Sequence, residues 1–267
     1  MTEDRSIVTF RRPRRIWAVG AVHGDAERLA ALHDLMRSRL AYGDRLVYMG
    51  NYLGFGDAIF ATISELLRFR RMFLSIPPYM DESDCVYLRG AQEEMWQKLL
   101  QLQFSNRPAE DLAWMLDRGV AATLEAYGGA AEEGFAQAEA GVVALTGWTG
   151  ALRDHMRVAS GHEAMMNSLK RAAMSRAGGV LFVNSGIDVS RELSQQTDSF
   201  WWAGRSFALI QDRYAGFRRV VRGYDPVHGG LAETNNTLTV DGGCGFGGSL
   251  AAFCLTPEGD ILERLES

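Results

Sequence analysis

The chain has 267 residues, of which 47% are hydrophobic, and its formal net charge is -5 at pH 7. A chain of this length and composition can bury a sizeable core, and we expect one large domain. The negative net charge argues against proteins whose main task is to grip nucleic acid or an anionic membrane, because such proteins need a net basic field.

The chain starts with a basic segment. Four arginines stand between positions 11 and 15, and we expect residues 1–15 to form a flexible, solvated tail. The apolar run that follows, at 16–19, is too short for a signal-peptide core or a membrane span. The three cysteines have no paired spacing typical of metal sites. The sequence therefore predicts a cytoplasmic protein with reduced thiols and no membrane span.

Short apolar runs that end in glycine or asparagine recur along the chain. They lie at 16–20, 46–50, 86–90, 180–184 and 220–223. Each run is typical of a buried strand that leads into a tight turn. Between the first two runs, apolar residues recur at helical spacing, which indicates a strand, a helix and a strand. Such a crossover predicts parallel pairing of the two strands.

The composition changes between residues 93 and 177, where Met, Leu, Ala, Trp and Glu dominate. This predicts several helices, which we interpret as a helical insertion in a single domain spanning 16–267. Strand-like runs return at 237–241, 250–255 and 261–265, and the last two predict a hairpin.

In a sheet of parallel strands, the loops that follow the strands line the usual ligand crevice. The loops after the five runs read GAVHG (20–24), GNYLGFG (50–56), GAQE (90–93), NSG (184–186) and RGY (222–224). Two further stretches are RGVAATLEAYG (118–128) and VDGGCGFGG (240–248).

In this order and spacing, the five loops resemble the signatures GDxHG, GDxxDRG, GNHE, HAG and HGH of the calcineurin-like metallophosphoesterases. The likeness is greatest to the bacterial protein-phosphatase and diadenosine-tetraphosphatase-like group, whose GGxxTLxSYG and IDTGxxxGG stretches are similar to the two further stretches. The resemblance covers nearly the whole chain. It implies an α/β (α+β) fold, a four-layer αββα sandwich with the helical insertion between the third and fourth motifs.

Family members hold two divalent metals such as Mn, Fe or Zn, and a bridging hydroxide attacks phosphorus. Most of the matching metal-ligand positions carry a different residue in this chain. In place of the two aspartates, the asparagine and the three histidines stand Ala21, Asn51, Ala91, Asn184, Arg222 and Tyr224. His23 is the only retained ligand-type residue.

The positions that match catalytic helpers have changed as well. Gln92 replaces the general-acid histidine, Gly54 its aspartate partner, and Phe55 the phosphate-gripping arginine. Arg89, just before the third motif, is the basic neighbour that remains.

These replacements work against metal binding. Alanine offers no donor atom, and neutral amides coordinate divalent metals weakly. A guanidinium at position 222 repels a nearby cation. The sequence therefore predicts no catalytic residues, no stable metal centre and no cofactor.

Two uses of the remaining polar groups stay open. In the first, Arg222, alone or together with Arg89, holds a phosphate or carboxylate, because guanidinium groups match such anions. Alternatively, Arg222 pairs with Asp225 and plugs the old site. Likewise, His23 is either a proton shuttle or a hydrogen-bonded structural residue.

A rewired mononuclear metal site is a further hypothesis. Its ligands would come from acidic and histidine side chains in or just after the loops, namely Asp25, Asp57, Asp188, Asp225, His228 and Asp241. Asp25 and Asp57, however, precede helical runs and are more typical of helix N-caps.

Three functions follow. The first is a pseudophosphatase that acts as a binding or regulatory module for a phosphorylated protein, a nucleotide or another protein. The second is a divergent metal-dependent phosphoesterase, serine/threonine phosphatase-like, with a rewired site. The third is a scaffold protein that does not use the cleft. The first predicts binding without turnover, the second metal-dependent turnover, and the third neither.

Overall fold

The computed structural model describes residues 6–267 and contains two mixed β-sheets. The strands of the first sheet, in spatial order, are β1 (Ile7–Phe10), β5 (Ala172–Ser175), β6 (Val180–Val183), β7 (Arg219–Arg222), β9 (Thr237–Thr239) and β8 (Ala232–Glu233). Those of the second are β11 (Ile261–Glu266), β10 (Ala251–Leu255), β2 (Ile16–Val19), β3 (Arg45–Tyr48) and β4 (Cys85–Tyr87).

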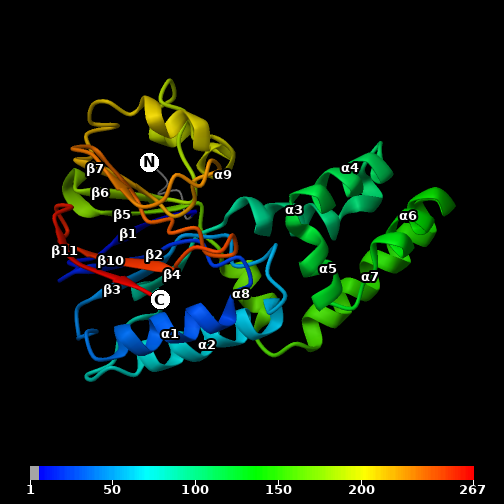
Figure 1. Cartoon of the computed structure of the whole chain (residues 1–267), viewed down its shortest axis with the longest axis horizontal. Helices are drawn as coiled ribbons and strands as arrows, with labels where there is room; N and C mark the ends of the chain where they lie inside the picture. The colour runs from blue at the N-terminus through cyan, green and yellow to red at the C-terminus, as the bar shows by residue number, and fades with distance from the viewer. Residues whose placement is uncertain (1–5) are drawn as a thin grey trace.

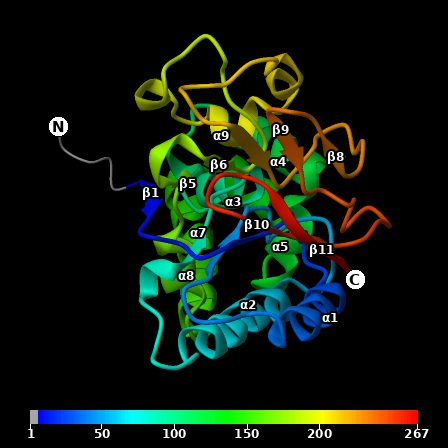
Figure 2. The same ribbon diagram turned by 90° about the vertical axis from the view of Figure 1, so that its left-hand side faces the viewer.

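The strands alternate between two cores, and this alternation stacks the sheets. In β2, Ile16 and Ala18 join an apolar cluster shared by both sheets, whereas Trp17 and Val19 join a cluster with the helices below. These helices are α1 (Ala26–Arg37) and α2 (Ile59–Leu74). The short helix α9 (Ser199–Trp202) covers the outer face of the first sheet. Figures 1 and 2 show these layers, which confirm the predicted four-layer sandwich.

The pairing of the strands agrees with the local patterns. β2 and β3 pair in parallel around α1, as the crossover predicts, and β10 and β11 form the predicted antiparallel hairpin. All four residues of β2, β3 and β6 are buried, which explains why these strands are apolar apart from Arg45, whose guanidinium contacts Asp84 at 2.9 Å.

The expectation of a flexible tail through position 15 is wrong for much of that segment. Residues Ile7–Phe10 form β1, which pairs in parallel with β5 at the edge of the first sheet. Arg15 is also held, because its guanidinium contacts the buried carboxylate of Asp44 at 2.6 Å. Residues 1–5 of the predicted tail lie outside the described residues.

The segment predicted as a helical insertion contains six helices. Its helices are α3 (Ala91–Leu99), α4 (Pro108–Met115), α5 (Ala121–Ala126), α6 (Ala131–Ala140), α7 (Val142–Val158) and α8 (His162–Ser168). Figure 1 shows α4, α6 and α7 reaching away from the sandwich as an arm. The helical part ends before position 177, because β5 already belongs to the sheet. None of the helices within residues 6–267 is long and apolar enough to cross a membrane.

The two predicted helix caps differ in outcome. Asp25 caps α1, since its carboxylate accepts a hydrogen bond of 3.0 Å from the backbone N–H of Arg28. The cap expected at Asp57 is wrong, because α2 starts one residue later, after Ala58, with no side-chain cap.

A buried polar chain ties α1 to β3 and α2. His33 Nδ1 lies 2.6 Å from Glu65, the hydroxyl of Tyr48 lies 2.8 Å from His33 Nε2, and the imidazole stacks on Phe69. Burial lowers the pKa of His33, so the ring is neutral and donates from Nδ1. Burial raises the pKa of Glu65, but hydrogen bonds from His33 and Arg68 outweigh it and bring this pKa to about 2.

We expect Glu65→Gln to lower the free energy of unfolding by about 2 kcal/mol at pH 7.5. The folded-state pKa of Glu65 is below its ordinary value of 4.5, so the ionised carboxylate stabilises the fold above pH 4.5. That contribution is lost as the pH falls toward 2. Urea unfolding at pH 7.5, 5.5 and 3.5 should therefore show the gap between wild type and variant narrowing at the lowest pH. The exposed control Glu139→Gln should be as stable as wild type at all three pH values. A difference in stability between wild type and Glu65→Gln that stays the same at every pH would contradict the role given to the ionised Glu65.

Candidate functional site

The five loops named from the sequence meet at one edge of the sandwich. The carbonyl of Asn51 accepts hydrogen bonds from the backbone N–H groups of Val22 and His23, at 3.1 and 2.8 Å. The N–H of Ala21 donates to Gly223, and that of Tyr224 donates to Asn184, both at 2.9 Å. The side chain of Asn51 joins the third loop, because its Oδ1 accepts from the N–H of Gln92 at 3.2 Å. All the loops predicted to line one crevice are thus in contact.

Close backbone approach explains two of the glycines. A Cβ at Gly90 would lie 2.2 Å from Asn51 Oδ1, and one at Gly223 would lie 2.3 Å from the Cβ of Met49. Three larger residues of the loops adopt left-handed backbone conformations, with φ of 52° at His23, 56° at Asn51 and 60° at Phe55. Such conformations are uncommon outside glycine and concentrate at functional sites.

Glu93 holds the loops together, and the sequence analysis missed it. Its buried carboxylate accepts hydrogen bonds from the N–H groups of Asn51 (2.8 Å), Tyr52 (2.7 Å), Leu53 (3.2 Å) and Gly90 (2.8 Å). Burial raises the pKa of Glu93, whereas these hydrogen bonds oppose the rise. The available signal was the retained glutamate of the GNHE-like motif at the start of a helix.

The positions that match metal ligands hold mostly neutral groups. Ala21 and Ala91 are buried and offer no side-chain donor. Asn184 is buried, and its Nδ2 donates to the carbonyl of Met49 at 2.7 Å. The Oδ1 of Asn184 and the Nδ2 of Asn51 have no hydrogen-bond partner.

Aromatic rings surround His23. The rings of Phe55, Tyr224 and Phe246 have centroids 5.4, 5.2 and 5.2 Å from the imidazole, each edge to face. His23 is 1% exposed, and neither ring nitrogen makes a hydrogen bond of good geometry with any of residues 6–267. Burial lowers the pKa of His23 to about 3, so the ring is neutral at physiological pH.

The outer side of this cluster reaches the surface. Phe55 and Phe246 are 41% and 40% exposed, and the exposed ring of His228 lies 4.0 Å from that of Phe246. We call Phe55, Phe246 and His228 the aromatic rim. The sequence analysis missed Phe246 as a site residue, although it stands inside the glycine-rich stretch that follows β9.

The helper positions pack against the helical arm. Gln92 Nε2 donates to the carbonyl of Arg118 at 2.7 Å, and its Oε1 occupies the space beside Gly54, where a Cβ would lie 2.2 Å away. The N–H of Phe55 donates to the carbonyl of Gly119 at 3.1 Å. These contacts link the second and third loops to the segment between α4 and α5.

Both candidate anion-binding arginines have carboxylate partners. Arg222 contacts Asp225 at 2.9 Å, donates to the hydroxyl of Thr239 at 2.9 Å, and lies over the ring of Phe207. Arg89 contacts Glu94 at 2.8 Å. Burial lowers the pKa of Arg222, and the charge of Asp225 opposes that shift. The Arg222–Asp225 pair is the arrangement expected of a plugged site, and anion binding by Arg89 and Arg222 stays a prediction.

Comparison with known proteins adds to this geometry. The sequence matches no protein-family model and no curated protein. A crystal structure provisionally assigned as a diadenosine tetraphosphatase matches with a TM-score of 0.56, 18% identity and 98% coverage of both chains. A serine/threonine phosphatase from Saccharomyces cerevisiae with similarity to human PP5 also gives 0.56, at 12% identity, over 98% of this chain and 84% of that one. A cold-active protein tyrosine phosphatase gives 0.52, at 11% identity, over 98% and 80%.

The chain has the calcineurin-like phosphatase fold. At these identities the likeness concerns the fold alone, so the chemistry must be judged from the side chains present. The donor set does not fit a dinuclear metal centre of the calcineurin-like type. One imidazole and amide groups cannot offset two divalent cations, and Arg222 adds a positive charge.

Two candidate ligands for a rewired metal site, Asp225 and Asp241, already accept hydrogen bonds from backbone N–H groups. Asp225 accepts from the N–H groups of Val227 and Gly229, both at 3.1 Å, besides its pairing with Arg222. Asp241 accepts from the N–H groups of Asp225 and Gly243 at 2.8 and 2.9 Å. Within residues 6–267, no three His, Cys, Asp or Glu side chains gather closely enough to hold a metal ion.

Proposed function

We propose that the protein is a pseudophosphatase, which uses the calcineurin-like fold to bind a partner and does not hydrolyse phosphoesters. The observation that carries the proposal is the packing of His23, the one retained ligand-type residue, among Phe55, Tyr224 and Phe246. Rings at these positions exclude water and supply no anionic ligand, whereas phosphoester hydrolysis by a metal pair needs both ligands and a bound hydroxide.

The partner we favour is a protein that contacts the aromatic rim. Exposed aromatic side chains supply much of the binding energy at protein interfaces. A phosphorylated group or a nucleotide would instead need free cationic donors, and both Arg89 and Arg222 already face carboxylates. The buried, unpaired thiols of Cys85, Cys244 and Cys254 support action in the reducing cytoplasm.

Metal content and turnover test the proposal directly. The purified protein, incubated separately with manganese, iron and zinc, should bind less than a tenth of an equivalent of metal by elemental analysis. It should also leave p-nitrophenyl phosphate unhydrolysed above the buffer rate. Near-stoichiometric metal with turnover would instead support the rewired phosphoesterase and direct attention to Asp225, His228 and Asp241.

Restoring two ligands should not restore activity. The double variant Ala21→Asp, Asn51→Asp should remain inactive with each metal, because Asn184, Arg222 and Tyr224 still leave the second metal, and part of the first, without ligands. Circular dichroism would confirm that the variant is folded, and the same assay would report turnover. Substantial metal-dependent hydrolysis by this variant would show that the remaining positions suffice for a metal pair.

A further inference from the structure

A second candidate binding site lies in the helical part of the chain. A pocket of about 190 Å³ opens between α3, the C-terminal half of α7, and α8. Its apolar wall consists of Trp96, Leu100, Met156 and Met166, and the charged groups at its border include Arg153 and Glu163. An apolar space of this size accommodates roughly six to ten non-hydrogen atoms, since an engineered cavity of about 150 Å³ holds benzene.

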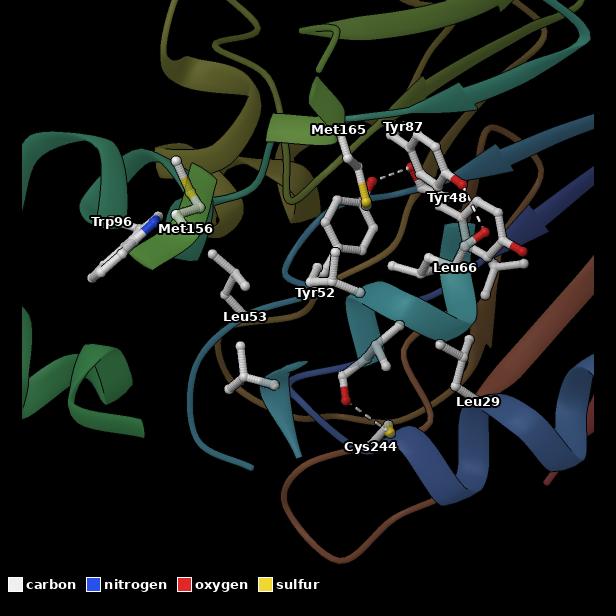
Figure 3. Packing of buried hydrophobic residues seen from close by; sticks show 14 of the residues in the cluster. Leu29, Tyr48, Tyr52, Leu53, Leu66, Tyr87, Trp96, Met156, Met165 and Cys244 are labelled. Carbon is white, nitrogen blue, oxygen red and sulfur yellow. Dashed lines mark hydrogen bonds between the residues drawn. The ribbon is translucent and has the colours of Figure 1, made fainter. Parts of the chain in front are cut away.

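Trp96 forms part of the apolar wall of the pocket. It is 2% exposed, and its indole Nε1 is fully buried and has no hydrogen-bond partner among residues 6–267. Stacking on Tyr127, with ring centroids 5.3 Å apart, fixes the orientation of the indole. Figure 3 shows the nitrogen on the side of Met156, another residue of the pocket wall. Because this nitrogen is closed off from the pocket, the indole contributes its apolar ring to the wall and not its N–H.

Arg153 gives the pocket a cation that no acid neutralises. One of its terminal nitrogens donates to the carbonyl of Leu100, and within residues 6–267 it takes part in no ion pair. The nearby Glu163 is held by Arg157, at 3.7 Å. The carboxylate of Glu93, which also borders the pocket, is engaged by four backbone N–H groups.

We propose that this pocket binds a small apolar carboxylic acid. The apolar body packs against Trp96, Met156 and Met166, and the carboxylate accepts hydrogen bonds from the guanidinium of Arg153. Charge-assisted hydrogen bonds from a guanidinium are among the strongest available to a carboxylate. The site is separate from the aromatic rim, so the inference does not depend on the proposed function.

Benzoate and its neutral counterpart benzamide probe this site, because they share a ring and differ in charge. We expect calorimetric or NMR titration of the full chain at pH 7.5 to give benzoate a Kd of about 0.1–1 mM, the range for a ligand of this size. Benzamide should bind at least about fivefold more weakly, for want of the charge-assisted contact.

Three variants assign the contacts. Arg153→Gln should weaken benzoate binding about tenfold and remove the preference over benzamide, whereas Arg153→Lys should retain part of that preference. Trp96→Phe, which keeps an aromatic ring but reduces the apolar wall, should weaken both ligands equally, by a few fold. The matched control is Trp148→Phe, which removes the unpartnered N–H of another buried tryptophan outside the pocket. It should leave both affinities unchanged.

Several results would overturn the proposal. They are equal binding of benzoate and benzamide, an unchanged preference in Arg153→Gln, or no saturable binding of either benzoate or hexanoate up to 10 mM. Urea unfolding of each variant separates a lost contact from a lost fold. A variant that fails to fold is replaced by Met166→Trp, which should block benzoate binding by filling the pocket, and persistent binding in that variant would also overturn the proposal.

Discussion

Replacing Glu93 with alanine should lower the free energy of unfolding by about 3–5 kcal/mol, the largest effect we expect from any single substitution in the site. The variant leaves four backbone N–H groups, from the loops after β3 and β4, buried without their acceptor. Glu93→Gln should cost roughly half as much, because one carbonyl oxygen remains while the new amide N–H₂ faces backbone donors.

Urea unfolding at pH 7.5 measures both variants. The matched control is Glu94→Gln, on the same helix, whose carboxylate contacts Arg89 and Lys98 but accepts no backbone hydrogen bond from the loops. We expect the control to cost at most about 1 kcal/mol. If Glu93→Ala and Glu94→Gln were equally stable, the role of Glu93 in holding the loops would be disproved.

Arg222→Ala should lower the free energy of unfolding by about 3 kcal/mol. The substitution leaves the carboxylate of Asp225, whose side chain is 5% exposed, without its cation. The double variant Arg222→Ala, Asp225→Ala should be less destabilised than the sum of the two single variants, since no unpaired charge remains. A coupling free energy near zero in this cycle would contradict a stabilising pair.

The same substitution tests the anion hypothesis. If Arg222 holds a phosphate or a carboxylate, calorimetric titration with inorganic phosphate should show binding by wild type that Arg222→Ala abolishes. Because the guanidinium already contacts Asp225, Thr239 and Gly204, we expect no saturable phosphate binding by wild type at millimolar concentration.

The strands and helices of the sandwich could be predicted where the pattern of apolar residues in the sequence matches the residues that are buried in the structure. The segment that forms β2 is buried along its whole length, so its continuous apolar run predicts a strand. The apolar residues of α1 recur at helical spacing, so they predict a helix. The five loops were predictable as a site for the same reason. Each follows such a strand, and parallel strands bring their carboxyl ends to one edge.

Other features depend on partners far away in the chain. β1 is only partly buried over three of its four residues, and nothing in its sequence marks it as a strand until β5 pairs with it. Phe246 becomes a site residue only because the glycine-rich stretch folds over His23. Glu93 reads as an ordinary acid in the first turn of a helix, and its four acceptor contacts exist only when two loops meet.

The pairing of β1 with β5 also bears on how the chain reaches its native state. Ile7 and its neighbour in the sheet, Ala172, are separated in the sequence by α1, α2 and the whole helical arm. The first sheet thus cannot gain its edge strand until the helical arm has been produced, and closing so long a loop slows folding. We expect early intermediates to contain β2, β3 and β4 with α1 and α2 in place, while β1 and the hairpin of β10 and β11 are not yet paired with their distant partners.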